Sequence, residues 1–317
     1  MREERRREQT KLLNKLKGIE TEEEEKKEDK NETKQIKEKK KTPKLFFFIF
    51  LIITFVIIYS TYIEPKLLFK VNEYSIKTNK IDETMNGLKI VSFSDIHYGT
   101  TIGEKELTKY IKKINSLKPD IIIFTGDLFD RNIKIQQDSI NIIKEKFNEL
   151  EASLYKYAIY GDNDYENKEQ YQDILNSSNF TLIDNSSKLL YTESNIPIVL
   201  SGINDYEKID YTFINNPIDD IDISNYYKIV LDHEPDNVDN YISTNPDLIL
   251  TAHSLGGLIR IPKIGGIINK VGSKKHNKNY EKINNIIVYN SYGLGTSNIK
   301  IRFNNPPSID LYRLYLD

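Results

Sequence analysis

The residues of this chain that could do chemistry are carboxylates and imidazoles that directly follow apolar runs. They are Asp95, His97, Asp127, Asp162, His233 and His253. Mixed carboxylate and imidazole ligands suit Mn, Fe or Zn better than Ca or Mg, which prefer shells made of oxygen alone. The pattern therefore predicts a site for divalent transition-metal ions.

Composition narrows the chemistry further. The 317 residues include no cysteine, which excludes disulfides, cysteine-based zinc sites and thiol catalysis. With 4 histidines in the whole chain, those that recur at metal-ligand spacings carry more weight than usual. A formal net charge of -2 provides no basic field to attract nucleic acid.

Predicted strands bring these side chains to one edge of a layered fold. From about residue 70, apolar runs alternate with amphipathic segments, a pattern typical of βαβ units and layered α/β packing. Strands are predicted at 88–93, 121–124, 157–160, 197–203, 227–232, 247–251 and 284–290, and helices at 103–117 and 137–149. In open α/β sheets, ligands gather at the carboxyl ends of the strands. We therefore expect the polar residues that follow these strands to converge.

Each residue taken alone has a plainer explanation. An aspartate at the end of a strand usually caps a helix or a turn. A single histidine is usually a satisfied core or surface residue. The order of the whole set, with each member after an apolar run, is what indicates a shared site.

That ordered set resembles the calcineurin-like metallophosphoesterases. It reads Asp-x-His, Gly-Asp, Gly-x-x-Asp, His and Ala-His-x-x-Gly-Gly, from about Leu88 to the C-terminus. Supporting segments are FSDIHYG at 93–99, KPDIIIFTGDLFD at 118–130, and YGLGTSNIKIRFNNPPSIDL at 292–311, the last being similar to membrane-anchored bacterial members. The resemblance implies a two-sheet αββα sandwich over residues 87–317 and hydrolysis of a phosphoester by a metal-bound hydroxide.

The resemblance also implies a role for each ligand. Asp95 and His97 would hold a first ion, Asp127 would bridge two ions, and Asp162, His233 and His253 would hold the second.

Three positions depart from the family pattern. Asp162 stands where the family has a ligating asparagine, and Asn163 stands at the position of the family's general acid. An amide can donate a hydrogen bond but cannot transfer a proton. Leu255 stands at the fourth ligand of the first ion, so we expect that site to bind more weakly than the second. His276 is a remote candidate to fill the gap, and Arg260 is either a phosphate-binding residue or a surface arginine.

An uncharged stretch at residues 45–63 is predicted to be a transmembrane helix, being close in length to the hydrocarbon core. A cleaved signal peptide is the other interpretation. Residues 1–44 form a charged tail expected to be disordered or at most a solvated helix, and residues 64–86 are a linker and first strand. Lysines cluster before the span, so the positive-inside rule places the tail in the cytoplasm and the catalytic domain outside the cell membrane.

Three functions remain open. The first is a phosphoesterase at the outer membrane surface, acting on a phosphodiester, with lipid-linked and cell-wall-linked phosphodiesters as the candidate substrates. The second is a catalytically weakened or inactive member of the family that serves as a binding or scaffold protein. The third, a cytoplasmic enzyme with nucleotide substrates, requires the charge rule to fail.

Overall fold

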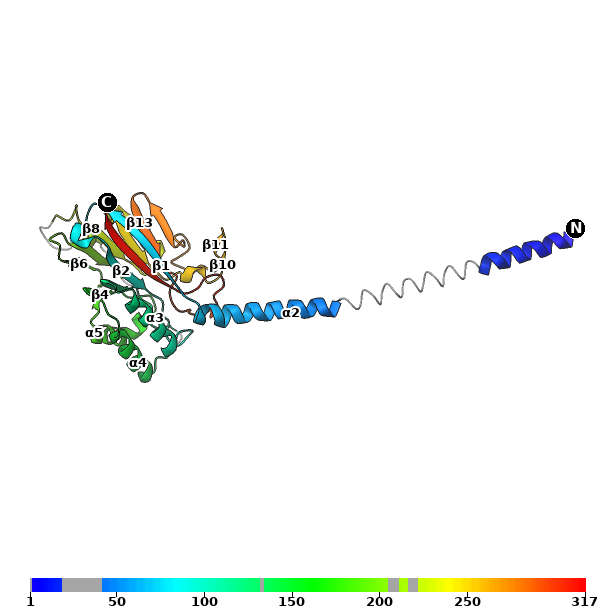
Figure 1. Ribbon diagram of the computed structural model, residues 1–317, viewed down its shortest axis with the longest axis horizontal. Coiled ribbons are helices and arrows are strands. Elements are labelled where there is room, and N and C mark those ends of the chain that lie inside the picture. The colour runs from blue at the N-terminus through cyan, green and yellow to red at the C-terminus, as the bar shows by residue number, and fades with distance from the viewer. Residues whose placement is uncertain (1, 19–41, 132–133, 205–210, 216–221) are drawn as a thin grey trace. The chain divides into compact units, whose positions relative to one another are not determined.

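The computed structural model describes residues 2–18, 42–131, 134–204, 211–215 and 222–317 (Figure 1). The chain divides into two compact units, Met1–Ile57 and Ile58–Asp317. In the first unit, residues 2–18 are helical and all their side chains are exposed. The remainder of the tail predicted to be disordered, residues 19–41, lies outside the described residues.

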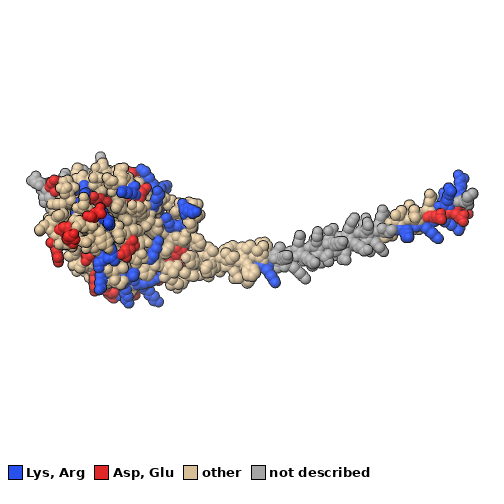
Figure 2. All heavy atoms as spheres, turned by 45° about the horizontal axis from the view of Figure 1, so that its top comes forward, with Lys and Arg blue, Asp and Glu red and all other residues tan. Residues whose placement is uncertain are grey.

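Within the part of the chain that the structure describes, one helix is long and apolar enough to cross a membrane, judged by length and composition. It covers the 24 residues Lys44–Leu67, which are all but the first two residues of α2 (Thr42–Ile58) together with the π-helical segment that follows. No charged residue follows Lys44 within α2, and Figure 2 shows the stretch of chain next to the domain mostly in tan. Its continuation, the π-helical turn Tyr59–Leu67, contains Pro65, which has no N–H to donate and disfavours a continued α-helix.

The second unit is built on two sheets of six strands each. The first sheet has the order β1-β14-β2-β3-β4-β5, and β2 to β5 run parallel. Its strands are β1 (Lys70–Thr78), β14 (Ser308–Leu316), β2 (Leu88–Phe93), β3 (Ile121–Phe124), β4 (Tyr155–Ala158) and β5 (Thr181–Leu182). The segment expected as linker and first strand thus supplies the edge strand β1, which pairs in parallel with β14.

The second sheet has the order β12-β13-β9-β8-β7-β6, with a parallel centre and an antiparallel strand at each edge. Its strands are β12 (Tyr280–Ile283), β13 (Ile286–Asn290), β9 (Leu248–Thr251), β8 (Tyr227–Leu231), β7 (Ile198–Gly202) and β6 (Ser186–Leu190). Because both centres are parallel, each sheet gathers the carboxyl ends of its central strands at one edge.

Alternation along the strands builds the layers. In β3, Ile121 and Ile123 face the apolar layer between the two sheets, while Ile122 and Phe124 pack under the helices on the other face. Those helices are α3 (Glu104–Ser116), α4 (Gln137–Asn148) and α5 (Lys168–Ser177), and their buried residues share one cluster with the sheet. The second sheet is covered by the short helix α6 (Val238–Tyr241) and the 3-10 turn Tyr211–Ile214. The predicted αββα sandwich is confirmed.

The local sequence explains where α3 begins and which of its faces is buried. In α3 the carboxylate of Glu106 accepts the N–H of Gly103 at 3.0 Å, which satisfies a free donor at the helix start. Leu107, Ile111 and Ile114 recur every three or four residues and are all buried. The helix predicted at 103–117 is therefore confirmed within one residue at each end.

Candidate metal centre

The loops that follow five central strands carry the candidate ligands. In the first sheet, Asp95, Asp127 and Asp162 follow β2, β3 and β4. In the second sheet, His233 and His253 follow β8 and β9. The candidate site is therefore built from side chains of both sheets and not from one sheet alone.

The side chains meet in two groups that share one carboxylate. In each group, candidate ligand atoms lie within 4.8 Å of one another. One group is Asp127, Asp162, His233 and His253, and the other is Asp95, His97 and Asp127. These are the residues of the two ligand sets that the sequence predicted. The larger group corresponds to the second ion and the smaller to the first.

Four buried ligand atoms point to an ion. Among the described residues, Asp95 Oδ1, His97 Nε2, His233 Nε2 and His253 Nδ1 are buried and have no hydrogen-bond partner. A buried polar atom without a partner costs about 1–3 kcal/mol, so four of them in one place are expensive unless something binds them. Divalent cations bound there would satisfy all four, and the residues present therefore fit the metals that the fold implies.

In each imidazole, the ring nitrogen that faces away from the cluster makes a contact that fixes the orientation of the ring. His97 Nδ1 lies 3.2 Å from the carbonyl of Phe129, and His233 Nδ1 lies 2.7 Å from that of Thr125. His253 Nε2 lies 2.7 Å from the carbonyl of a third residue, Val271. A carbonyl only accepts, so these nitrogens carry the proton, and the opposite nitrogen presents a lone pair to the cluster.

The backbone is held in an uncommon conformation at four of the ligands. Asp95, His97, Asp127 and His253 have φ of 49°, 44°, 60° and 62°. Residues other than glycine rarely adopt this left-handed region, and each costs about 1–3 kcal/mol. Such strain clusters at functional sites, where the surrounding structure imposes it.

Close contact with Asp127 and Asp95 requires two glycines. A Cβ added at Gly161 would lie 2.3 Å from the backbone nitrogen of Asp127. A Cβ added at Gly293, whose φ is 65°, would lie 2.6 Å from the Cβ of Asp95. Only glycine fits at either position without moving a ligand.

Charges in the cluster are strongly coupled. Burial opposes ionisation of Asp95, but the nearby imidazole of His97, 3.7 Å away, and the charges of His233 and Lys270 outweigh it and hold its pKa well below the ordinary value. Burial also opposes protonation of His233, yet the neighbouring Asp127 carboxylate raises its pKa well above the ordinary value. A metal ion at this site therefore competes with a proton on His233.

The structure shows what surrounds Asn163 and Leu255, two of the positions at which this chain departs from the family pattern. The side-chain amide of Asn163 donates to Asp127 Oδ2 at 2.6 Å, and its backbone N–H donates to Asp127 Oδ1 at 2.9 Å. Asn163 therefore holds the shared carboxylate. Leu255 is buried, its side chain has no atom that can bind a metal, and its carbonyl accepts a hydrogen bond from Asn305 at 2.7 Å.

The remaining candidates lie apart from the cluster. The Arg260 guanidinium lies 4.6 Å over the ring of Tyr292 and donates to the carbonyl of Gly256 at 2.9 Å. The ring of His276 lies between Glu281 and Asp239, at 2.8 and 3.4 Å, and belongs to neither ligand group among the described residues. His276 thus has partners of its own instead of completing the first site.

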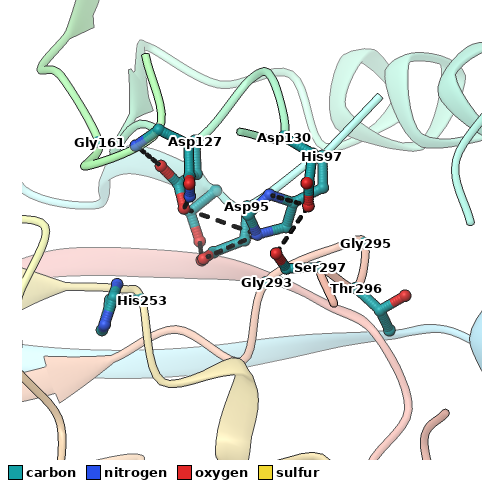
Figure 3. A network of polar contacts seen from close by, with 12 residues as sticks. Asp95, His97, Asp127, Asp130, Gly161, His253, Gly293, Gly295, Thr296 and Ser297 are labelled. Carbon is teal, nitrogen blue, oxygen red and sulfur yellow. Dashed lines mark hydrogen bonds and ion pairs between the residues drawn. The ribbon is translucent and has the colours of Figure 1, made fainter. Parts of the chain in front are cut away.

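Two supporting carboxylates were missed by the sequence analysis. Asp164 accepts from the backbone N–H of Asp127 at 2.8 Å and of Gly161 at 2.9 Å, which joins the loop after β3 to the loop after β4. Asp130 lies 3.6 Å from His97 Nδ1 and accepts the hydroxyl of Ser297 at 2.6 Å (Figure 3). Both residues stand within the motifs quoted above, but their sequence separation from these partners conceals the contacts.

An open cavity adjoins the larger ligand group. It measures about 670 Å³ and is lined by Arg131, Asp162, Tyr165, Glu166, Lys168, Asp184, Asn185 and Asn204. The exposed guanidinium of Arg131 lies 3.6 Å from the Asp162 carboxylate. A smaller cavity of about 120 Å³ shares Asp162 and reaches His233. A ligand that binds next to the second ion site therefore has space in this cavity and can contact the guanidinium of Arg131.

Comparison with known proteins identifies the family. The calcineurin-like phosphoesterase profile matches residues 88–257. The chain is 28% identical to the uncharacterized metallophosphoesterase YkuE of Bacillus subtilis (strain 168), over 81% of this chain and 88% of that protein. It is 26% identical to the UDP-2,3-diacylglucosamine pyrophosphatase LpxG of Chlamydia muridarum, over 81% of this chain and 92% of that protein.

A vertebrate relative is named as a membrane protein. The "transmembrane protein with metallophosphoesterase domain" of Danio rerio is 27% identical over 59% of this chain, which spans 45% of that protein. With its αββα sandwich and two ligand groups, this chain belongs to the calcineurin-like phosphoesterase family.

Proposed function

We propose that this chain is a membrane-anchored, metal-dependent phosphoesterase that holds two divalent ions, of Mn, Fe or Zn type, at Asp95, His97, Asp127, Asp162, His233 and His253. The observation that carries the proposal is the set of four buried ligand atoms that face the cluster without a hydrogen-bond partner among the described residues. Bound divalent ions would polarise a phosphoryl oxygen and lower the pKa of water.

Residues of the chain supply the remaining functions. Asn163 donates to both oxygens of Asp127 and so fixes the carboxylate shared by the two ligand groups. A phosphate and its substituent would lie in the cavity beside Asp162, where Arg131 and Lys168 are the cations of a lining that also holds Glu166 and Asp184. The planar guanidinium of Arg131 can donate two parallel hydrogen bonds to a carboxylate or phosphate, which the ammonium of a lysine cannot do.

The nature of the leaving group follows from Asn163. Because an amide cannot give up a proton, the site suits leaving groups that depart as anions without protonation. Phosphodiesters with acidic leaving groups and diphosphates meet this requirement. The relative LpxG is named a pyrophosphatase of a diacylated sugar nucleotide, which favours lipid-linked or cell-wall-linked substrates at the membrane surface for this chain as well.

Hydrolysis of a p-nitrophenyl phosphodiester by the full chain in detergent, with Mn²⁺ added, tests the proposal. Asp127→Asn removes charge from the shared ligand and should lower activity by about 10²-fold or more. Asp173→Asn, on the exposed face of α5, is the matched control and should retain activity. Equal activity in both variants would mean that the cluster does not perform the reaction.

A second candidate function is a binding or scaffold protein that retains the fold. It is favoured by Leu255, which leaves the first ligand group with three residues, and by Asn163 at the general-acid position. A chain that retains metal but hydrolyses neither a diester nor a diphosphate would support this alternative.

A further inference from the structure

A hairpin between the ligand His253 and strand β12 exposes a row of aliphatic side chains. Its strands are β10 (Arg260–Ile261) and β11 (Gly265–Gly266), which pair antiparallel around a tight turn. The exposed fractions are 42% for Ile261, 76% for Ile264, 51% for Ile267 and 78% for Val271. Soluble surfaces scatter apolar side chains singly, whereas a contiguous group of them marks a contact with another molecule or with a membrane.

Charge distinguishes this segment from the rest of the surface. The face in Figure 2 carries basic and acidic side chains side by side. In contrast, the sequence from Ser254 to Tyr280 contains no aspartate or glutamate. Its basic residues are Arg260, Lys263, Lys270, Lys274, Lys275 and Lys278. Aliphatic side chains flanked by cations are the composition that binds anionic bilayers at the level of the headgroups.

The hairpin is continuous with the end of the apolar span. Its first strand pairs with the loop at Phe303, through Arg260 N to Phe303 O at 3.0 Å and Phe303 N to Leu258 O at 3.0 Å. The ring of Phe303 in turn packs edge-on against Tyr59 at 5.9 Å. The same loop donates from Asn304 N to Glu64 Oε2 at 2.8 Å.

The contacts at Tyr59 and Glu64 lie within the compact unit, and both residues belong to the span Lys44–Leu67. Figure 1 shows β10 and β11 on the side of the unit where the chain enters it. The apolar row thus lies next to the point where the chain leaves the bilayer.

We propose that the hairpin, residues 259–271, is a second membrane contact that seats Ile261, Ile264 and Ile267 in the headgroup region of the anionic leaflet next to the span. A span alone leaves a domain free to rotate about one connection, whereas a span plus a seated hairpin fixes its orientation. The hairpin also adjoins the metal centre, since the carbonyl of Val271 accepts the Nε2 proton of His253 at 2.7 Å. If the proposed function holds, the membrane-bound hairpin keeps the metal centre at the level of the bilayer where the phosphate of a lipid-linked phosphoester lies.

Depth-dependent quenching tests the contact without requiring catalysis. The chain contains no cysteine, so Ile264→Cys can be labelled at one position with an environment-sensitive fluorophore. Ile196→Cys is the matched control, because Ile196 is 38% exposed and lies between β6 and β7, at the far edge of the second sheet. The full chain is reconstituted in vesicles of phosphatidylcholine with about one third phosphatidylglycerol, with and without spin-labelled acyl chains.

We expect acyl-chain quenching at position 264 and none at position 196. Absence of quenching at 264, or equal quenching at both positions, would overturn the proposal. Emission at 264 that shifts with protein concentration and persists in detergent would mean that a second copy of the chain covers the row, which would also overturn it.

A kinetic comparison tests the consequence for lipid-linked substrates. Ile264→Glu should raise the KM for a phosphoester embedded in the vesicles roughly tenfold, the loss expected when an inserted aliphatic side chain becomes charged. It should leave hydrolysis of a soluble p-nitrophenyl diester unchanged, and Ile196→Glu should change neither. Quenching at 264 in a chain that hydrolyses nothing would keep the membrane contact and remove the proposed function, so the two can fail separately.

Discussion

The three imidazoles around Asp127 each have one ring nitrogen satisfied by the protein and one that has no hydrogen-bond partner among the described residues. The three imidazoles donate to backbone carbonyls, and Asn163 donates to the shared carboxylate. Asp164 satisfies the N–H groups of the two loops that carry Asp127 and Asp162. The unsatisfied ligand atoms of the centre therefore point inward, toward positions where cations fit.

Asn163→His tests the interpretation of the leaving group. An imidazole can transfer a proton, and a general acid is typically worth about 10²–10⁴-fold. We expect the variant to hydrolyse diesters with alkyl leaving groups at least about tenfold faster, with little gain for p-nitrophenyl esters. The measurement is the ratio of kcat/KM for the two substrates. An unchanged ratio would show that the rate does not depend on leaving-group protonation at this position.

A second residue-scale prediction concerns Asp310 in β14, which belongs to neither ligand group. Burial raises its pKa to about 6 from an ordinary value of 3.8, although Asn72 donates to it at 2.7 Å. Because the folded state binds this proton more tightly, its contribution to stability is complete below pH 3.8 and is lost as the pH rises through 6.

Asp310→Asn should therefore raise the melting temperature at pH 8 and change it little at pH 4. The shift in pKa corresponds to at most about 3 kcal/mol in the free energy of unfolding. Melting of the full chain in detergent, with a chelator at every pH to exclude metal effects, measures it. A variant that is destabilised at pH 8 would show that Asp310 is needed as an anion.

At the scale of elements, the segment Tyr59–Leu67 is clamped onto the loop at Asn304 and Asn305. The buried carboxylate of Glu64 accepts the N–H groups of Asn304 and Asn305. The Asn305 side chain donates to the carbonyl of Leu255 at 2.7 Å, two residues from His253. Two hydrogen bonds thus link the end of the span to the segment that carries the candidate ligand His253.

Glu64→Ala should destabilise the fold by about 1–3 kcal/mol, because it leaves the N–H of the buried Asn305 without an acceptor, and it also removes the acceptor of the more exposed Asn304 N–H. Glu64→Gln keeps one acceptor oxygen and should be affected less. Glu169→Ala, an exposed change on α5, is the control. Thermal melting of the full chain ranks the variants, and equal melting temperatures for all three would contradict the clamp.

The elements, and the residues that the structure brings together in the two groups, could be predicted from the sequence for a local reason. Asp95, Asp127 and His253 each follow a short apolar run, and those runs are β2, β3 and β9. Glu64 shows what local patterns leave out. Beside the span it looked like a flanking charge, but its partners lie 240 and 241 residues away. The pairing of β1 with β14 across the length of the domain, and the contact of Asp164 with the backbone of Asp127, are hidden for the same reason.

At the scale of the whole molecule, the orientation of the membrane span decides which substrates the domain can reach. Lysines cluster before residue 45, while Glu64 and Lys66 roughly cancel after the span. The positive-inside rule then predicts that residues beyond 64 lie outside the cell. Protease added to intact cells should digest this domain. Complete protection until lysis would reverse the orientation and favour cytoplasmic substrates.

The central claim is that the two ligand groups bind divalent ions with unequal strength. Titration of the metal-free full chain with Mn²⁺, followed by elemental analysis, tests it most directly. We predict about one tightly held ion per chain, a second that binds only at higher free metal, and loss of both in Asp127→Ala, since Asp127 belongs to both groups. Asp95→Ala should remove only the weaker ion. Binding of no ion, or metal binding that is unaffected by Asp127→Ala, would contradict the account.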